Sequence, residues 1–123
     1  MEVREYTKYF VVSDFVLDYQ GPKPETTLDA LNMSIAKWHI VSTSDPLIIM
    51  DGAISTCGLC RLYYNDCCES CPVSYNTGIS CCRDTPCERF YDWRYTDEKV
   101  ARTAATAEYR YLLKLKKEFL SRI

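Results

Sequence analysis

The stretch CGLCRLYYNDCCESCPVSYNTGISCCRDTPC, residues 57–87, contains all eight cysteines of a 123-residue chain. Within it, two residues separate the cysteines of the pairs Cys57/Cys60 and Cys68/Cys71. This spacing lets a tight turn direct two thiolates toward one tetrahedral ion, so two such pairs supply four ligands. All-thiolate coordination suits zinc or an iron–sulfur cluster, and zinc is the commoner ion in closed structural sites. The sequence therefore predicts a zinc-binding segment at residues 57–87.

The choice of the four ligands stays open at this point. Seven residues link the two pairs, fewer than in a standard site built from two such turns. A compact alternative keeps Cys57, Cys60 and Cys71 and takes Cys82 in place of Cys68 as the fourth ligand. Neighbouring side chains usually point apart, so one member of each adjacent pair is expected to face away from a shared ion. The cysteines left without a ligand role are Cys67, Cys81 and Cys87.

Three other fates of the cysteines compete with a single zinc. A second zinc could use Cys81, Cys82 and Cys87 with one further ligand. An iron–sulfur cluster is suggested by Cys71-Pro72, although the regular spacing of bacterial ferredoxins is missing. A disulfide framework would require export, and the N-terminus MEVREYTKYF has no secretory signal pattern. We therefore expect a reducing cytoplasm, in which thiols stay available to a metal.

Catalysis has few residues to use in this chain. A catalytic cysteine needs a base, and His39 is the one histidine present. It lies on a predicted helix beside Trp38, where we expect it to be partly exposed rather than a ligand. Zinc enzymes normally keep an open position and use His or carboxylate ligands. A site made of cysteine alone favours a structural role, so we expect a protein that is not an enzyme.

On the N-terminal side of the cysteines, the residues predict a strand, a helix and a hairpin. Tyr, Phe and Val are dense over residues 9–17 and favour a strand, which QGPKPE interrupts. Thr26 can cap a helix that runs to about Ile40. Asp51-Gly52 suits the tight turn of a short hairpin. The helix would bury one face, made of Leu28, Leu31, Ile35 and Trp38.

On the C-terminal side, two helices are predicted. Thr85-Pro86 is typical of a helix start and favours a helix through Trp93. Residues 97–123 lack Gly and Pro, with acidic groups first and basic groups near the end. We therefore predict a small α+β fold, one domain over residues 1–123, with a zinc-bound centre and a long C-terminal helix. The apolar face of that helix is Ala101, Ala105, Leu112, Leu115 and Phe119.

Charge and hydropathy exclude several classes of protein. The net charge of −2 is unlike that of proteins held on nucleic acid mainly by phosphate contacts. No apolar run approaches the length of a membrane span. Residues 97–123 nevertheless carry seven basic and four acidic groups, so a nucleic-acid-binding helix is an alternative. Its contact residues would be Arg110, Lys114, Lys116 and Lys117, which otherwise form the wet face of an amphipathic helix.

A wider pattern surrounds the cysteines. It consists of AKW at 36–38, CGLC at 57–60, an aromatic residue at 63 or 64, CESCP at 68–72, TG at 77–78 and CRDTP at 82–86. With this pattern, about residues 30–95 resemble small cysteine-rich proteins of tailed bacteriophages. Cys87 departs from the pattern, which has Tyr there, and Cys67 and Cys81 are additional. The resemblance implies five shared cysteines: Cys57, Cys60, Cys68, Cys71 and Cys82.

Such phage proteins largely lack an assigned activity, so the resemblance implies a virus-encoded protein in the cytoplasm of an infected bacterium and little more. We expect an interaction protein that binds and modulates a host or phage protein, an inhibitor of host defence being one form of that role. Ten tyrosines fit this expectation, because tyrosine is enriched in binding hot spots. The alternatives are the nucleic-acid-binding module and an iron–sulfur or thiol redox protein.

Overall fold

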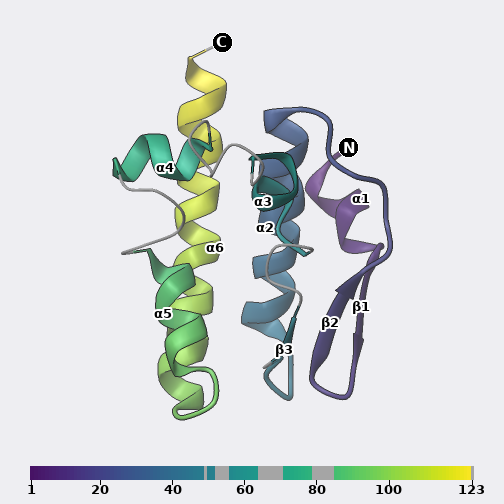
Figure 1. Cartoon of the computed structure of the whole chain (residues 1–123), viewed down its shortest axis with the longest axis vertical. Coiled ribbons are helices and arrows are strands. Elements are labelled where there is room, and N and C mark those ends of the chain that lie inside the picture. The colour runs from purple at the N-terminus through teal and green to yellow at the C-terminus, as the bar shows by residue number, and fades with distance from the viewer. Residues whose placement is uncertain (49, 52–55, 64–70, 79–84, 123) are drawn as a thin grey trace.

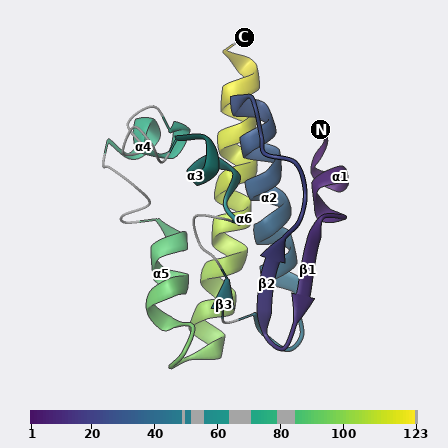
Figure 2. The same cartoon turned by 45° about the vertical axis from the view of Figure 1, so that its right-hand side comes forward.

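Two long antiparallel helices, α2 and α6, form the centre of the computed structural model (Figure 1). The structure describes residues 1–48, 50–51, 56–63, 71–78 and 85–122. Helices α1, α3 and α5 pack against this central pair, and a small sheet lies beside α2 (Figure 2). The predicted α+β class is therefore confirmed. The elements are α1 (Val3–Thr7), β1 (Phe10–Ser13), β2 (Val16–Tyr19), α2 (Thr27–Thr43), β3 (Met50–Asp51), α3 (Gly58–Tyr63), α4 (Pro72–Thr77), α5 (Pro86–Trp93) and α6 (Glu98–Ser121).

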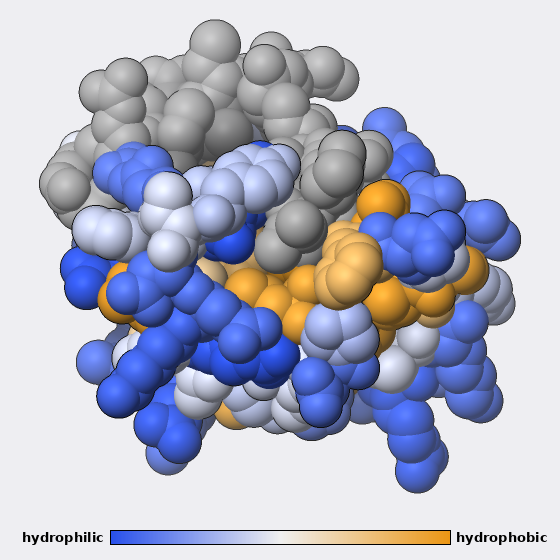
Figure 3. Space-filling view, turned by 90° about the horizontal axis from the view of Figure 1, so that it is seen from below, coloured by the Kyte–Doolittle hydropathy of each residue, from blue (hydrophilic) through white to orange (hydrophobic). Residues whose placement is uncertain are grey.

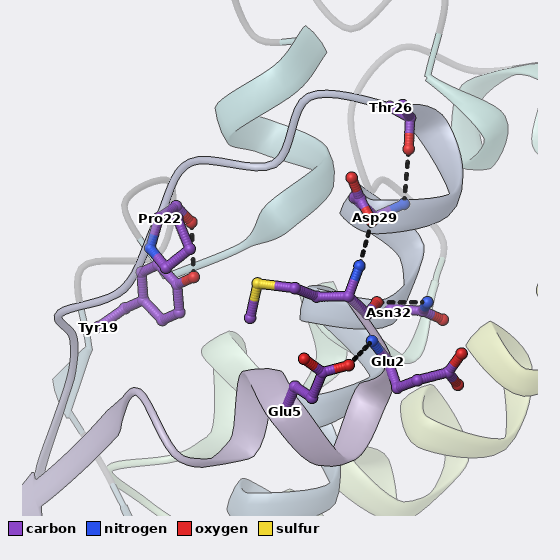
Figure 4. Close-up of polar contacts among 8 residues, drawn as sticks. Glu2, Glu5, Tyr19, Pro22, Thr26, Asp29 and Asn32 are labelled. Atoms are coloured by element: carbon purple, nitrogen blue, oxygen red, sulfur yellow. Dashed lines mark hydrogen bonds and ion pairs between the residues drawn. The ribbon is translucent and has the colours of Figure 1, made fainter.

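Helix α2 begins where the sequence predicts, because a side chain satisfies its first turn. Thr26 is the N-cap, and its hydroxyl accepts a hydrogen bond from the Asp29 backbone N–H at 3.1 Å (Figure 4). Asp29 in turn forms an ion pair of 2.8 Å with the amino group of Met1. The Asn32 amide donates to the Met1 carbonyl at 3.0 Å. These contacts hold the start of α1 against the first turns of α2.

The prediction that α2 buries a single face is wrong. Residues from Ala30 through Trp38 are all buried, including Asn32, Ser34 and Lys37. The reason is position: α1, α3 and α6 all contact α2, and no open side is left along this part of the helix. Trp38 fixes the centre of the core, with its ring edge-on to Phe90 at 5.2 Å between centroids. The polar residues Asn32, Ser34 and Lys37 are therefore buried in the core.

The prediction of one strand over residues 9–17 is also wrong, because the chain turns back within that stretch. Strands β1 and β2 are antiparallel, with Phe10 opposite Tyr19 and Ser13 opposite Val16. Asp14 and Phe15 make the two-residue turn, with φ angles of 51° and 67°. Two positive φ values are the signature of a type I′ hairpin turn. Asp tolerates this conformation, whereas a bulky Phe rarely adopts it, so propensity did not reveal the turn.

Strand β3 runs parallel to β2 and completes the sheet order β1-β2-β3. The predicted hairpin around Asp51-Gly52 extends into residues 52–55, which lie outside the described residues. The two C-terminal helices are confirmed: Pro86 is the first residue of α5, and Asp97 caps α6 by accepting from the Val100 N–H at 3.1 Å. Among the helices described, none pairs the length of a bilayer crossing with sufficient apolar character.

Candidate metal centre

Four cysteines from separate places in the sequence line one small cavity in the core. Cys57 directly precedes α3 and Cys60 lies within that helix, whereas Cys71 is the N-cap of α4 and Cys87 lies in the first turn of α5. The cavity volume is about 20 Å³. This is close to the ~10–15 Å³ that one water-sized sphere occupies, so the space suits an ion and not an organic substrate. The other lining residues are Ser34, Trp38, Leu59, Val73, Glu108 and Leu112.

Gly58 lets the first two cysteines lie against the central helix. A Cβ atom at this position would be 2.4 Å from the Ala30 carbonyl oxygen and 2.8 Å from the Met33 Cβ. Only glycine allows α3 to approach α2 this closely. Ser34 on α2 then contacts both ends of the junction: its Oγ lies 3.6 Å from the Cys57 Sγ and accepts from the Leu59 N–H at 3.1 Å. The CGLC segment is therefore fixed on α2.

The surroundings of Cys57 favour its thiolate. Hydrogen bonding from the Cys60 side chain is the largest influence and lowers the pKa of Cys57, which falls to about 5. The positive charge of Lys37, the Cys60 backbone N–H and the Ser34 hydroxyl lower this pKa further, while burial opposes them. Thiolate is the form of cysteine that binds metals.

Lys37 is a buried cation near these thiols. Its side chain is 1% exposed, and its Nζ donates to the Tyr91 hydroxyl at 2.7 Å. The same Nζ lies 5.0 Å from the centroid of the Trp38 ring. A charge buried in a core is stable only with partners, and this one acts on the Cys57 thiol, whose pKa it lowers. Lys37 is placed to offset the negative charge that thiolates would bring into the cavity.

Three of the four cysteines that share this cavity, Cys57, Cys60 and Cys71, are ligands that the sequence predicts. The fourth, Cys87, is predicted only as a ligand of an alternative second zinc. Cys68 and Cys82, the two candidates for the fourth place, lie outside the described residues. The structure therefore brings Cys87 to the three predicted ligands and leaves the choice among the other two untested.

Ser34, Lys37 and Glu108 lie at or near this cavity but were not among the predicted site residues. The sequence carried a signal for Glu108 and none for Lys37. Glu108 lies three residues after Ala105 and four before Leu112, so it falls on the predicted apolar face of α6, where it is 2% exposed. A charged residue on such a face is a recognisable candidate for a site. Lys37 carried no such signal, because it does not fall on the predicted face of α2.

The donor set matches a zinc site in chemistry more closely than in geometry. Four thiols in a mostly apolar wall, with Ser34 and Lys37 beside them, are the groups that a closed zinc site uses. Over the described ranges, however, no three His, Cys, Asp or Glu side chains lie close enough together to hold one ion as they stand. The described cysteines also form no disulfide with one another. The thiols share the cavity wall without meeting at one point.

The remaining candidate residues lie elsewhere on the surface. His39 is exposed, as predicted, and its ring packs against Tyr109 at 5.2 Å between centroids. Of the four basic residues proposed for nucleic-acid contact, Arg110, Lys114 and Lys117 are exposed at helical spacings of four and three. Lys116 is half-buried and two residues from Lys114, so it points away from the other three.

Comparison with family models, with curated proteins and with solved structures finds no match to this chain in any of the three.

Proposed function

We propose that this chain is a zinc-binding, non-enzymatic interaction protein whose metal joins the short helices α3, α4 and α5 to the central pair. The observation that carries the proposal is the shared cavity, an ion-sized space lined by four cysteines from α3, α4 and α5. The wall around the thiols is mostly apolar side chains, which suits a structural metal better than a catalytic one with an open position for substrate.

Cys57, Cys60, Cys71 and Cys87 would hold the zinc in this proposal, with Cys68 and Cys82 as the competing fourth ligands. The four side chains would have to reorient for their sulfurs to meet at one ion, and metal binding would drive this because it is coupled to the ordering of such loops. Ser34 would orient Cys57, and Lys37 would balance part of the negative charge of a tetrathiolate site. The zinc would supply structural cross-linking alone.

Metal analysis of protein purified without oxygen tests the proposal directly. We expect a colourless protein with about one zinc per chain. A brown protein with visible charge-transfer absorption would instead support the iron–sulfur or thiol redox alternative. Protein that is folded, fully reduced and free of metal would exclude both.

The partner in this proposal is a host or phage protein, met in the cytoplasm of an infected bacterium, and an inhibitor of host defence is one form the role could take. The resemblance in the sequence motivates this choice. Affinity capture from host lysate, with zinc-loaded and zinc-stripped chain in parallel, should return a partner retained by the loaded form alone. Failure of either form to retain a specific protein would argue against the role.

A nucleic-acid-binding module is the second candidate, favoured by the exposed face of Arg110, Lys114 and Lys117 on α6. If this face binds DNA or RNA, Lys114→Glu with Lys117→Glu should weaken binding at least tenfold and reduce its salt dependence. Lys99→Glu is the matched control, because Lys99 is equally a surface lysine of α6 but lies near the start of the helix. Titration of labelled oligonucleotides at several salt concentrations measures the effect, and absence of binding at low salt removes this candidate.

A further inference from the structure

The outer edge of the sheet is open. In the order β1-β2-β3, β1 is a terminal strand, and no described segment pairs with its outer side. Hydrogen-bonded and non-hydrogen-bonded pairs alternate along an antiparallel ladder, and Ser13 and Val16 close the two-residue turn as a hydrogen-bonded pair. The bond from the Gln20 N–H to the Tyr9 carbonyl, 2.9 Å, fits the same alternation. It follows that the N–H and C=O groups of Phe10 and Val12 point away from β2.

The side chains along this edge are incompletely covered. Val12 and Leu17 are cross-strand partners on the core-facing side of the sheet, yet Leu17 is 1% exposed and Val12 is 49% exposed. The core therefore covers Phe10 of β1 but does not reach Val12. A surface groove of about 560 Å³ lies beside Val12, with Phe15 and Ile40 among its walls. Figure 3 views the molecule from the end that carries the hairpin tip. It shows hydrophobic residues from the middle of this end to the right-hand side of the view.

Strand β1 is short, which itself limits pairing at an edge, but it lacks the other features that normally protect one. Exposed edge strands are usually blocked by a charged side chain, a proline or a bulge, because an unprotected edge pairs with other strands. The sequence of β1 is FVVS, with no charge and no proline, and its described pairing with β2 has no bulge. Val11, on the opposite face from Val12, is 41% exposed. An apolar edge of this kind is suited to another strand.

We propose that this edge binds a second copy of the chain, with the two β1 strands antiparallel about a two-fold axis at Val11. This register sets Phe10 of each copy opposite Val12 of the other, so all the outward backbone groups are used. It also brings Lys8, which precedes β1 in one copy, to the same end of the paired strands as Asp14, which follows β1 in the other. Both residues are exposed in the single chain, and their opposite charges complement each other twice in the dimer.

The proposed interface is small. Four backbone hydrogen bonds between the copies, together with the exposed side chains Val11, Val12 and Phe15, give an interface near the low end of specific protein contacts. We therefore expect a dimer that dissociates on dilution rather than an obligate one. Pairing would continue the sheet across both copies and would cover the groove beside Val12.

Sedimentation over a range of concentrations, on the full chain as purified, tests the dimer. Val11→Lys places two lysines against each other at the axis and should weaken dimerisation about tenfold or more, because like charges directly opposite are destabilising. Leu113→Lys is the matched control, since Leu113 is 40% exposed and lies on α6. Lys8→Glu should weaken the dimer as well, and adding Asp14→Lys should restore it if the hairpin stays folded.

Amide hydrogen exchange gives a second measurement that does not depend on a variant. The N–H groups of Val11 and Ser13 bond to β2 and should be protected at every concentration. Those of Phe10 and Val12 should gain protection only where the dimer forms. A chain that stays monomeric at high concentration overturns the proposal, even if this edge captures a different protein. So does a dimer whose dissociation Val11→Lys leaves unchanged.

Discussion

If the proposed zinc is bound, its removal is expected to lower the free energy of unfolding by about 5 kcal/mol or more, a large part of the ~5–15 kcal/mol that holds a typical domain together. The reason is the location of the cavity. Its four cysteines lie in or directly before α3, α4 and α5, so an ion held by them would cross-link these helices. Without an ion, several thiolates would also repel one another within an apolar wall.

Chemical denaturation with and without a strong chelator, followed by circular dichroism, measures this effect. Cys57→Ser, Cys60→Ser and Cys71→Ser should each reproduce the loss, and Cys87→Ser should do so if Cys87 is the fourth ligand. Cys67→Ser is the control for substitution within the cysteine block, because Cys67 has no ligand role in the proposal. Metal that leaves without any change in the unfolding midpoint would show that it does not stabilise the fold.

Ala105→Asp is expected to be the most damaging single substitution away from the cysteines, lowering the free energy of unfolding by about 4 kcal/mol. Ala105 is fully buried, and it lies on α6, the helix that makes the most extensive packing with α2. A carboxylate there would be cut off from solvent. Burial of such a charge either unfolds the helix pair or forces the group to stay protonated.

Ala107→Asp provides the control for this prediction. Ala107 is on the same helix but exposed, so the same change in helix propensity and net charge should alter the free energy of unfolding by no more than ~0.5 kcal/mol. Urea titration of the two variants gives the comparison. Equal stability of the two would mean that the face of α6 that packs on α2 has been assigned wrongly.

Local signals in the sequence were sufficient for the helices that begin with strong caps. Thr26, Pro86 and Asp97 each act within a few residues of the helix they start, so α2, α5 and α6 were predictable from neighbours alone. The burial of α2 was not predictable in that way. Which of its sides is covered depends on α1, α3 and α6, segments far away in the sequence. The burial of the polar residues Asn32 and Lys37 therefore could not be predicted from a local sequence pattern.

In the candidate site, too, some residues could be predicted from local sequence and others could not. The spacing of Cys57 and Cys60 is local and identified them, whereas Cys87 joins them only through the packing of α5 on α6. The hairpin shows the opposite failure, because a strong local preference for strand hid the turn. Phe15 occupies a conformation that its side chain disfavours, and pairing of the flanking residues, Ser13 with Val16, outweighs that preference.

The order in which the chain is synthesised gives the burial of α2 one more consequence. Helix α2 leaves the ribosome early. Helix α6, the element against which α2 packs most extensively, leaves last. Until then a nascent chain must carry the apolar surface of Leu31, Ile35 and Trp38 without its cover, and such surface attracts chaperones or other nascent chains. An ion bound at the cysteine block before α6 emerges would keep the intervening segment compact during this interval. Availability of zinc during translation would then decide the yield of native protein, separately from the stability of the finished fold.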